Sequence, residues 1–238
     1  MNALWIAAAA ILALAAFTQS LTGFGLALVS MPLLSMVMSL PQATALVAVV
    51  SLGVEVVILW QHRAHLRWQP VRRLIFASWV GVPLGVVLLR RLPETWMLHG
   101  LGALLVAYGL YALSGKPLPT LQRPGWGWAA GLTAGALGGA YNTSGPPVIL
   151  YGHARGWPPQ AFKANLQAFF LASSSMVFGA HLVAGDISVA TWAQAAAALP
   201  ALALGLWAGH RAAAFLPPDG FRKVVLAALV LLGLKMLW

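Results

Sequence analysis

The chain has 238 residues, of which 61% are hydrophobic and 8% are charged, a composition that excludes an ordinary soluble domain and is typical of a protein embedded in a lipid bilayer. Its formal net charge of +10 comes from basic residues in short loops between apolar runs, which disfavours nucleic acid as a partner. The chain has no cysteine, which excludes thiol nucleophiles, disulfides and thiolate metal sites.

In chain order, the sequence begins with an apolar but interrupted stretch at 3–40, which lacks the basic start of a secretory signal peptide and is expected to belong to the mature fold. A second interrupted stretch lies at 125–157. The remaining apolar runs are of the kind that crosses a hydrocarbon core of roughly 30 Å. They predict six membrane helices, at 42–61, 74–89, 96–114, 164–184, 189–209 and 221–237.

The two halves of the chain resemble each other. A shift of 124 positions places 92–113 on 216–237, with eight identities in 22 positions, and pairs Gly81 with Gly205. The two interrupted stretches also correspond, with their glycine-containing polar steps, Thr22-Gly23 and Ser144-Gly145, placed against each other.

This duplication predicts the fold class and the organisation of the chain. We expect an all-α polytopic membrane protein of two repeats, each a broken helical hairpin followed by three transmembrane helices. The broken hairpin is either re-entrant or a pair of short crossings. The first transmembrane repeat is expected at 1–114, a cytoplasmic linker at 115–124 and the second repeat at 125–238.

The distribution of Lys and Arg predicts how the repeats are oriented, because cytoplasmic loops carry an excess of these residues. If each broken stretch crossed the membrane once, the 14 basic residues would divide seven against seven. If each returns to its own side, they divide eleven against three, with only Arg90, Arg91 and Lys235 outside. We therefore expect inverted repeats with both termini on the non-cytoplasmic side. The loops expected inside are 62–73, 115–124, 153–163 and 211–223.

Polar residues and helix breakers coincide at the two expected hairpin tips, "QSLTGFG" (19–25) and "YNTSGPP" (141–147). Irregular backbone at membrane depth has to line a cavity or be buried in protein, and inverted-repeat transporters bind substrate at such breaks. Ser, Thr and Asn before Gly or Pro are helix-start signals, and a helix start attracts anions. The alternative is that these residues only cap kinked helices whose glycines allow close packing.

The sequence therefore predicts a site for a small anion between the hairpin tips, built from tip residues and from polar side chains on the helices that follow. For those on the following helices, hydrogen bonds between helices are an equal alternative. The candidate substrate-binding residues are Gln19, Ser20, Thr22, Gly23, Asn142, Thr143, Ser144, Gly145, Pro146, Thr44, Asn165 and Gln167.

Glu55 is the only acid clearly inside an apolar run, and an ionisable group there is a candidate for coupling anion movement to protons. The alternative is an acid in a wet cytoplasmic vestibule that pairs with a loop arginine. His62 and His65 share a helical face but have no nearby carboxylate or thiol in the sequence. We therefore expect neither a metal ion nor a cofactor.

Three motifs carry a family resemblance: "TGFGLALVSMPLL" near the N-terminus, "GALGGAYNTSGPPVILYG" after the midpoint and the following "FKANLQAFF". They resemble the TauE/SafE family of sulfite exporters and sulfonate-related anion permeases. The resemblance implies a polytopic protein of the bacterial-type inner (plasma) membrane that moves a small anion, often a sulfur oxyanion or organosulfonate. Two positions depart from the expected pattern. Phe24 stands in a run that is commonly richer in glycine, and Lys163, which fits a cytoplasmic anchor as well as a substrate contact, stands where an arginine is expected.

The expected function is a secondary transporter that carries the anion by alternating access, with proton coupling as a further hypothesis. An uncoupled anion channel and a transporter of small carboxylates are the alternatives. An intramembrane enzyme is disfavoured because the interior hydroxyls have no histidine and acid pair near them in the sequence. A membrane chaperone or assembly factor is disfavoured because the loops are short.

Overall fold

The computed structural model describes residues 3–121, 123, 125–215 and 218–238, with backbone only at 218 and 219. Within these residues the chain is all-helical, as the sequence predicts, with ten α-helices and one short 3-10 helix. The helices are α1 (Ala3–Thr22), α2 (Leu26–Leu34), α3 (Leu40–His62), η1 (Arg63–His65), α4 (Trp68–Arg91), α5 (Glu94–Leu113), α6 (Gly125–Tyr141), α7 (Gly145–Ala154), α8 (Pro159–Val183), α9 (Val189–Ala212) and α10 (Pro218–Met236).

Six of these helices are long and apolar enough to cross a membrane, namely α1, α3, α4, α5, α8 and α9. The six helices predicted from uninterrupted apolar runs are all present as α3, α4, α5, α8, α9 and α10. Most begin a few residues earlier than the runs, because polar and proline residues such as Gln160 and Pro159 fit the first turn of a helix. The chain is therefore a multi-pass membrane protein.

Both interrupted stretches break into a long helix and a short one, at 23–25 and at 142–144. The short helices α2 and α7 have nine and ten residues. At 1.5 Å per residue they are about 14 and 15 Å long, which is about half of the hydrocarbon core. The arms of each hairpin are unequal, since α1 has 20 residues and α6 has 17.

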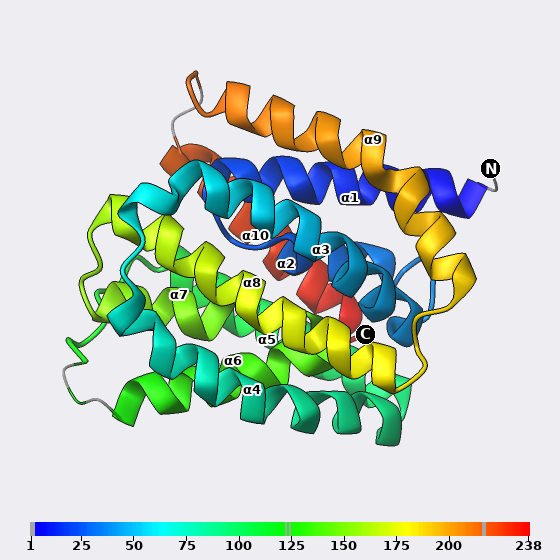
Figure 1. The fold of residues 1–238 in the computed structure, drawn as a ribbon, viewed down its shortest axis with the longest axis horizontal. Helices are drawn as coiled ribbons and strands as arrows, with labels where there is room; N and C mark the ends of the chain where they lie inside the picture. The colour runs from blue at the N-terminus through cyan, green and yellow to red at the C-terminus, as the bar shows by residue number, and fades with distance from the viewer. Residues whose placement is uncertain (1–2, 122, 124, 216–217) are drawn as a thin grey trace.

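Figure 1 shows how the two hairpins lie in the bundle. Helix α1 runs leftward from the N-terminus and α2 turns back to the right, whereas α6 starts at the left and α7 turns back to the left (Figure 1). The N-terminus and the end of α10 both lie toward the right (Figure 1). Each short helix thus returns toward the end of the bundle from which its long partner started.

Small residues allow the long helices to approach closely. Helix α4 packs most extensively on α6, and α9 packs on α1. A methyl group at Gly85 or Gly139 would overlap a backbone carbonyl of the facing helix in the α4–α6 pair, and one at Gly205 would do so in the α1–α9 pair. Helix α5 packs on α10, and α3 packs on α8. These pairs hold the two breaks in the middle of the molecule, as close packing of small residues does in membrane bundles.

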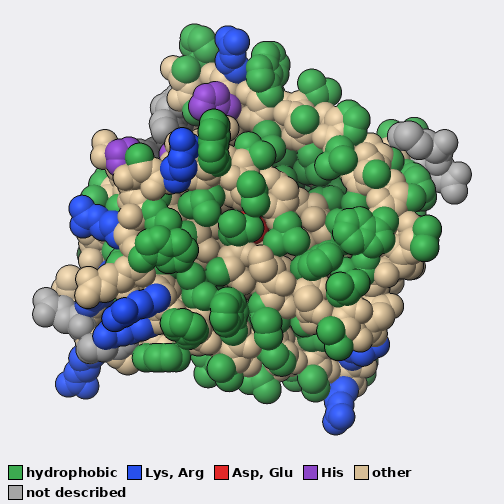
Figure 2. Space-filling view, viewed as in Figure 1, with side chains coloured by type: hydrophobic (Ala, Val, Ile, Leu, Met, Phe, Trp, Pro, Cys, Tyr) green, Lys and Arg blue, Asp and Glu red, His purple; other side chains and the backbone are tan. Residues whose placement is uncertain are grey.

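Side-chain types are segregated along the bundle. In Figure 2 most Lys and Arg side chains gather toward the left end, a few lie at the lower right, and a hydrophobic band lies between them. The buried interior is mainly Leu, Val, Ala and Phe, and it also contains buried polar side chains such as Gln19, Thr143 and Glu55. A buried polar group needs a partner or a function, so these side chains identify the region that contains the candidate site.

Candidate functional site

The two breaks have the same backbone geometry. Gly23 follows α1 with φ 77°, and Asn142 follows α6 with φ 54°. The N–H of each donates to the carbonyl four residues earlier, at 2.7 Å in both cases. The structure therefore matches Gly23 with Asn142, and the sequence-based match of Thr22-Gly23 with Ser144-Gly145 is three positions out of register.

The start of α7 is where the sequence predicts it. Ser144 occupies the N-cap position, and prolines lie in the first turn that begins at Gly145. The start of α2 differs from the prediction, because its N-cap is Gly25 and Thr22 is the last residue of α1. The Thr22 hydroxyl donates to the Thr18 carbonyl at 2.7 Å, which binds it into α1 and removes it from the role of a helix-start residue.

The two half-helix starts meet. A Cβ atom built on Gly145 would lie 2.8 Å from the carbonyl oxygen of Phe24, so the two breaks contact each other through their backbones. The ring of Phe170, on α8, packs 3.7 Å from the same built position at both Gly25 and Gly145. Two helix N-termini, each with unpaired N–H groups and a partial positive charge, therefore converge on one point.

A small cavity lies at this point, and we call it the central cavity. It is lined by Phe24, Gly25, Leu26, Ala27, Leu28, Ser51, Glu55, Asn142, Thr143, Ser144, Gly145 and Phe170. Its volume of about 10 Å³ is enough for roughly one water molecule. A cavity of this volume is too small for an ion larger than a water molecule.

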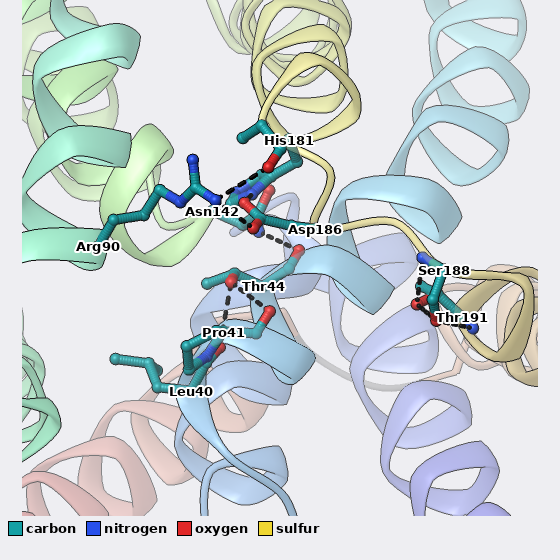
Figure 3. Close-up of polar contacts among 10 residues, drawn as sticks. Leu40, Pro41, Thr44, Arg90, Asn142, His181, Asp186, Ser188 and Thr191 are labelled. Carbon is teal, nitrogen blue, oxygen red and sulfur yellow. Dashed lines mark hydrogen bonds and ion pairs between the residues drawn. The ribbon is translucent and has the colours of Figure 1, made fainter.

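Four of the predicted site residues line the central cavity, all of them from the second break: Asn142, Thr143, Ser144 and Gly145. The Asn142 side-chain amide donates to the Thr44 carbonyl on α3 at 2.8 Å, which ties the tip of the second hairpin to α3 (Figure 3). The Thr143 hydroxyl donates to the Tyr141 carbonyl at 3.0 Å. The Ser144 hydroxyl makes no capping bond within the described residues, so it is available to a ligand.

The polar side chains of the first hairpin are engaged elsewhere. The Gln19 amide donates to Gln167 on α8 at 3.3 Å, and both side chains are buried. The Ser20 hydroxyl donates to the Leu206 carbonyl on α9 at 3.3 Å. The first break therefore contributes backbone and the Phe24 ring to the central cavity. Of its hydroxyls, that of Ser20 links α1 to α9 and that of Thr22 bonds within α1.

The polar side chains on the following helices are also engaged in hydrogen bonds within the protein. The Thr44 hydroxyl donates to carbonyls of its own helix, at Leu40 and Pro41 (Figure 3). The Asn165 side-chain oxygen accepts the backbone N–H of Arg67 at 2.9 Å, which joins α8 to the loop before α4. Of the remaining predicted residues, Pro146 is buried in the first turn of α7, and Thr22 and Gly23 line a different cavity from the central one.

Glu55 does line the central cavity. It is 5% exposed, and its Oε1 accepts the Ser174 hydroxyl on α8 at 2.9 Å. Its other carboxylate oxygen is buried with no partner among the described residues. The described contacts of Glu55 include no arginine, which the alternative interpretation requires, and Glu55 instead lines the central cavity together with Thr143 and Ser144.

Sequence reasoning missed three components of this site. Phe170 and Ser174 come from α8, and Ser51 lies one helical turn before Glu55 on α3. The one sequence signal was the run of three serines at 173–175 inside an apolar helix. The run does not reveal which serine faces Glu55, because that depends on how α8 packs on α3.

A second polar cluster lies between the end of α4 and the α8–α9 loop. The Nδ1 of His181 lies 2.8 Å from Asp186, and Arg90 lies 3.5 Å from the other oxygen of the same carboxylate (Figure 3). Arg90 also donates to the Ala184 carbonyl at 2.9 Å. This histidine and acid pair closes the loop at the end of the bundle, and no hydroxyl joins it among the described contacts. No group of three metal-ligating side chains occurs in the described residues.

The fold and site define a class: a polytopic helical membrane protein in which two half-helices start at a common buried polar cavity. The family model described as "Sulfite exporter TauE/SafE" matches residues 8–236, so the chain belongs to the TauE/SafE family. This is a family of membrane transporters, and its members are exporters rather than enzymes.

Two curated relatives support this assignment. The chain is 27% identical to the "Probable sulfite/organosulfonate exporter TauE" of Cupriavidus necator, over 96% of this chain and 91% of the relative. It is also 27% identical to the "Probable inner membrane transporter protein TsaS" of Comamonas testosteroni, over 72% of this chain and 73% of the relative. No solved structure matches the chain significantly.

Proposed function

We propose that this chain is a secondary transporter that binds a small anion, a sulfur oxyanion or an organosulfonate, between the starts of α2 and α7 and moves it by alternating access. The observation that carries the proposal is the meeting of these two helix starts at the central cavity beside Ser144. Helix starts attract anions through their free N–H groups and partial positive charge, without a lysine in the site. The name of the Cupriavidus necator relative supports an anion of this class, and that of the Comamonas testosteroni relative supports an inner-membrane location.

The proposal includes two inverted repeats, at 1–114 and 125–238, joined by the cytoplasmic linker 115–124. The helix pairings support it. If each helix is replaced by its counterpart in the other half, α4 by α9 and α6 by α1, the α4–α6 pair becomes the α9–α1 pair. The α5–α10 and α3–α8 pairs each consist of two counterparts, so the same replacement leaves these pairs unchanged. Two repeats related by a pseudo-twofold axis produce this pattern, and rocking one against the other around a central site is how such transporters alternate.

The charge distribution supports an orientation for the proposed repeats. The end of the bundle that carries eleven of the 14 basic residues is the cytoplasmic end, because cytoplasmic loops hold the excess of Lys and Arg. Both termini then lie on the non-cytoplasmic side. An N-terminal reporter tag that proves cytoplasmic would overturn this orientation.

Proton coupling through Glu55 is a part of the proposal. The Glu55 carboxyl group lines the same small cavity as the helix starts, so a charged Glu55 and a bound anion would repel each other at short distance. A protonated Glu55 removes the repulsion and offers its proton as a hydrogen-bond donor. The anion and one proton therefore occupy the site together, which makes the transporter a proton–anion symporter.

The test is flux in liposomes that contain the purified protein. Uptake of sulfite, thiosulfate, sulfoacetate and small carboxylates is measured with and without a pH gradient. We expect saturable flux of sulfur anions that is faster when the anion side is acidic, and a Glu55→Gln variant whose flux is indifferent to the gradient. Flux without saturation and without gradient dependence would favour a channel. Faster flux of carboxylates than of sulfur anions would identify the protein as a carboxylate transporter instead.

Absence of flux for every anion would contradict transport itself. Flux that is unchanged in Asn142→Ala and Ser144→Ala would contradict the position of the site. Ser20→Ala serves as the internal comparison, because its hydroxyl donates to the Leu206 carbonyl and lines neither the central cavity nor the cavity that contains Thr22.

A further inference from the structure

A larger cavity lies at the basic end of the bundle, on the other side of Phe24 from the central cavity. Its volume is about 370 Å³, within the size range of pockets for small ligands. Its polar lining comes from three separated parts of the chain: Thr22 at the end of α1, His153 and Lys163 around the α7–α8 connection, and Arg222 in α10. We call it the cationic vestibule.

The cationic side chains of the vestibule are not neutralised by acids. Lys163 and Arg222 are both half-buried. Among the residues whose side chains the structure describes, the ion pairs all involve Asp186, so neither Lys163 nor Arg222 has a carboxylate partner there. Two such cations around one cavity match the oxygens of a small oxyanion, to which Lys and Arg form charge-assisted hydrogen bonds.

Phe24 separates the vestibule from the central cavity. It lines both cavities and is 4% exposed. Its ring packs edge-on against Tyr108 at 6.3 Å between centroids, and the Arg222 guanidinium lies 5.4 Å from its centroid on the vestibule side.

The backbone around Phe24 is suited to movement. Gly23 and Gly25 flank it with φ 77° and 96°, in a region where glycine carries no steric penalty. On the vestibule side, the Phe24 ring makes a cation–π contact with the Arg222 guanidinium. A cation–π contact at a partly exposed site is weak, so another partner of the guanidinium can replace the ring. An anion that binds Arg222 competes with the ring for the same guanidinium.

We propose that the cationic vestibule is a second anion site, the entry or exit site at the cytoplasmic end, and that Phe24 is the gate between it and the central cavity. This inference rests on the proposed function. The ligand chemistry is a small free oxyanion, such as sulfite or a sulfonate, held by Lys163 and Arg222. Binding draws Arg222 away from the Phe24 ring and frees the ring to turn out of the passage.

The first test measures equilibrium binding of methanesulfonate by calorimetry to the full-length protein in a neutral detergent. Lys163→Met and Arg222→Gln are each expected to weaken binding on the order of tenfold, the effect of removing one charge-assisted hydrogen bond. Lys163→Arg keeps the charge and is expected to bind like the wild type. Arg72→Gln is the matched control, because Arg72 is exposed on α4 and is not among the lining residues of either cavity.

A parallel arm replaces methanesulfonate with short-chain phosphatidylglycerol in the same detergent. Methanesulfonate binding that depends on Lys163 and Arg222 supports the proposal, whether or not the lipid competes. Lipid binding that depends on these residues while methanesulfonate does not bind would overturn it. Equal methanesulfonate affinity in Lys163→Met, Arg222→Gln and Arg72→Gln would also overturn it, and either variant alone decides the matter if the other fails to fold.

The gate is tested by flux in liposomes with Phe24→Ala and Phe24→Leu. We expect Phe24→Ala to let methanesulfonate pass without dependence on a pH gradient, and Phe24→Leu, which still fills the passage, to retain that dependence. Gradient dependence that is equal in both variants and the wild type would overturn the gate. The proposals for the vestibule and for the central site can be tested independently, because Ser144→Ala is expected to impair flux and to leave methanesulfonate binding in the vestibule intact.

Discussion

The first and second breaks share a backbone and differ in their side chains. Gly23 and Asn142 have the same left-handed geometry and the same hydrogen bond, and the helices that follow start at one cavity. The second break presents Thr143 and Ser144 to that cavity, whereas the first presents the Phe24 ring. The comparison teaches that two breaks with the same backbone geometry line one cavity differently, the second with hydroxyl-bearing side chains and the first with an aromatic ring.

The largest expected effect is a loss of anion affinity when a hydroxyl of the second break is removed, compared with removal of a hydroxyl of the first hairpin. Ser144→Ala removes a donor at the central cavity, and a hydrogen bond to a charged group contributes about 1.5–3 kcal/mol, or roughly 10- to 150-fold in affinity. Ser20→Ala, whose hydroxyl bonds to Leu206, is expected to leave the apparent affinity for sulfite nearly unchanged. Concentration-dependent flux in liposomes checks both variants, and equal losses would contradict this difference between the two hydroxyls.

The next effect concerns the contact between the breaks. A Cβ atom at Gly145 would lie 2.8 Å from the Phe24 carbonyl, so Gly145→Ala forces the two breaks apart and destabilises the protein by about 1–3 kcal/mol. Gly53→Ala is the matched control, because nothing lies within 4 Å of a Cβ atom built there. Thermal unfolding in detergent compares the two variants. A Gly145→Ala protein as stable as Gly53→Ala would show that the breaks are not in contact.

A smaller effect tests whether the shared backbone geometry is real. Gly23→Ala places a Cβ atom at φ 77°, which costs about 1–2 kcal/mol, whereas Gly23→Asn copies the residue found at the matching position of the second break. The nearest atom to a Cβ atom built at Gly23 is 3.9 Å away, so neither substitution clashes at its Cβ atom. We expect the unfolding temperature to fall for Ala and to stay close to the wild type for Asn. The reverse order would contradict the match.

The smallest effect is expected for Asn142→Gly. Glycine keeps the left-handed backbone and loses only the bond from the Asn142 amide to the Thr44 carbonyl, worth about 0.5–1.5 kcal/mol. Asn142→Ala loses the same bond and adds backbone strain, so it should unfold at a lower temperature than Asn142→Gly. The opposite ranking would mean that the φ of 54° carries no strain in this protein.

Much of the fold follows from local signals in the sequence. The apolar run 42–61 predicted α3, observed as Leu40–His62, because a membrane helix is set by the length of its hydrophobic segment. The second break followed from Pro146 and Gly145, which have strong backbone preferences at a helix start. The register of the first break did not follow, because Thr22 has a local alternative in the Thr18 carbonyl and remains in α1.

The site was predicted less completely, because its parts are brought together by packing between distant helices. Glu55 stood out as an acid in an apolar run, but its partner Ser174 depends on how α3 packs on α8. Phe24 was a departure from a family pattern, and its position between two cavities depends on Tyr108 and Arg222, which come from α5 and α10. Periodicity predicts elements, and it does not predict which polar side chains of different elements meet.

The central claim is that an anion binds beside Ser144, where the two half-helices start, and the natural absence of cysteine allows a direct measurement of it. A Ser144→Cys variant carries a single thiol, whose rate of modification by a small methanethiosulfonate reagent is measured in liposomes from each side. The account predicts that saturating sulfoacetate slows the modification severalfold, while a single thiol at Ser114, which is exposed at the end of α5, is unaffected. An unchanged rate at Ser144→Cys in saturating sulfoacetate, in a variant that still transports it, would contradict the account.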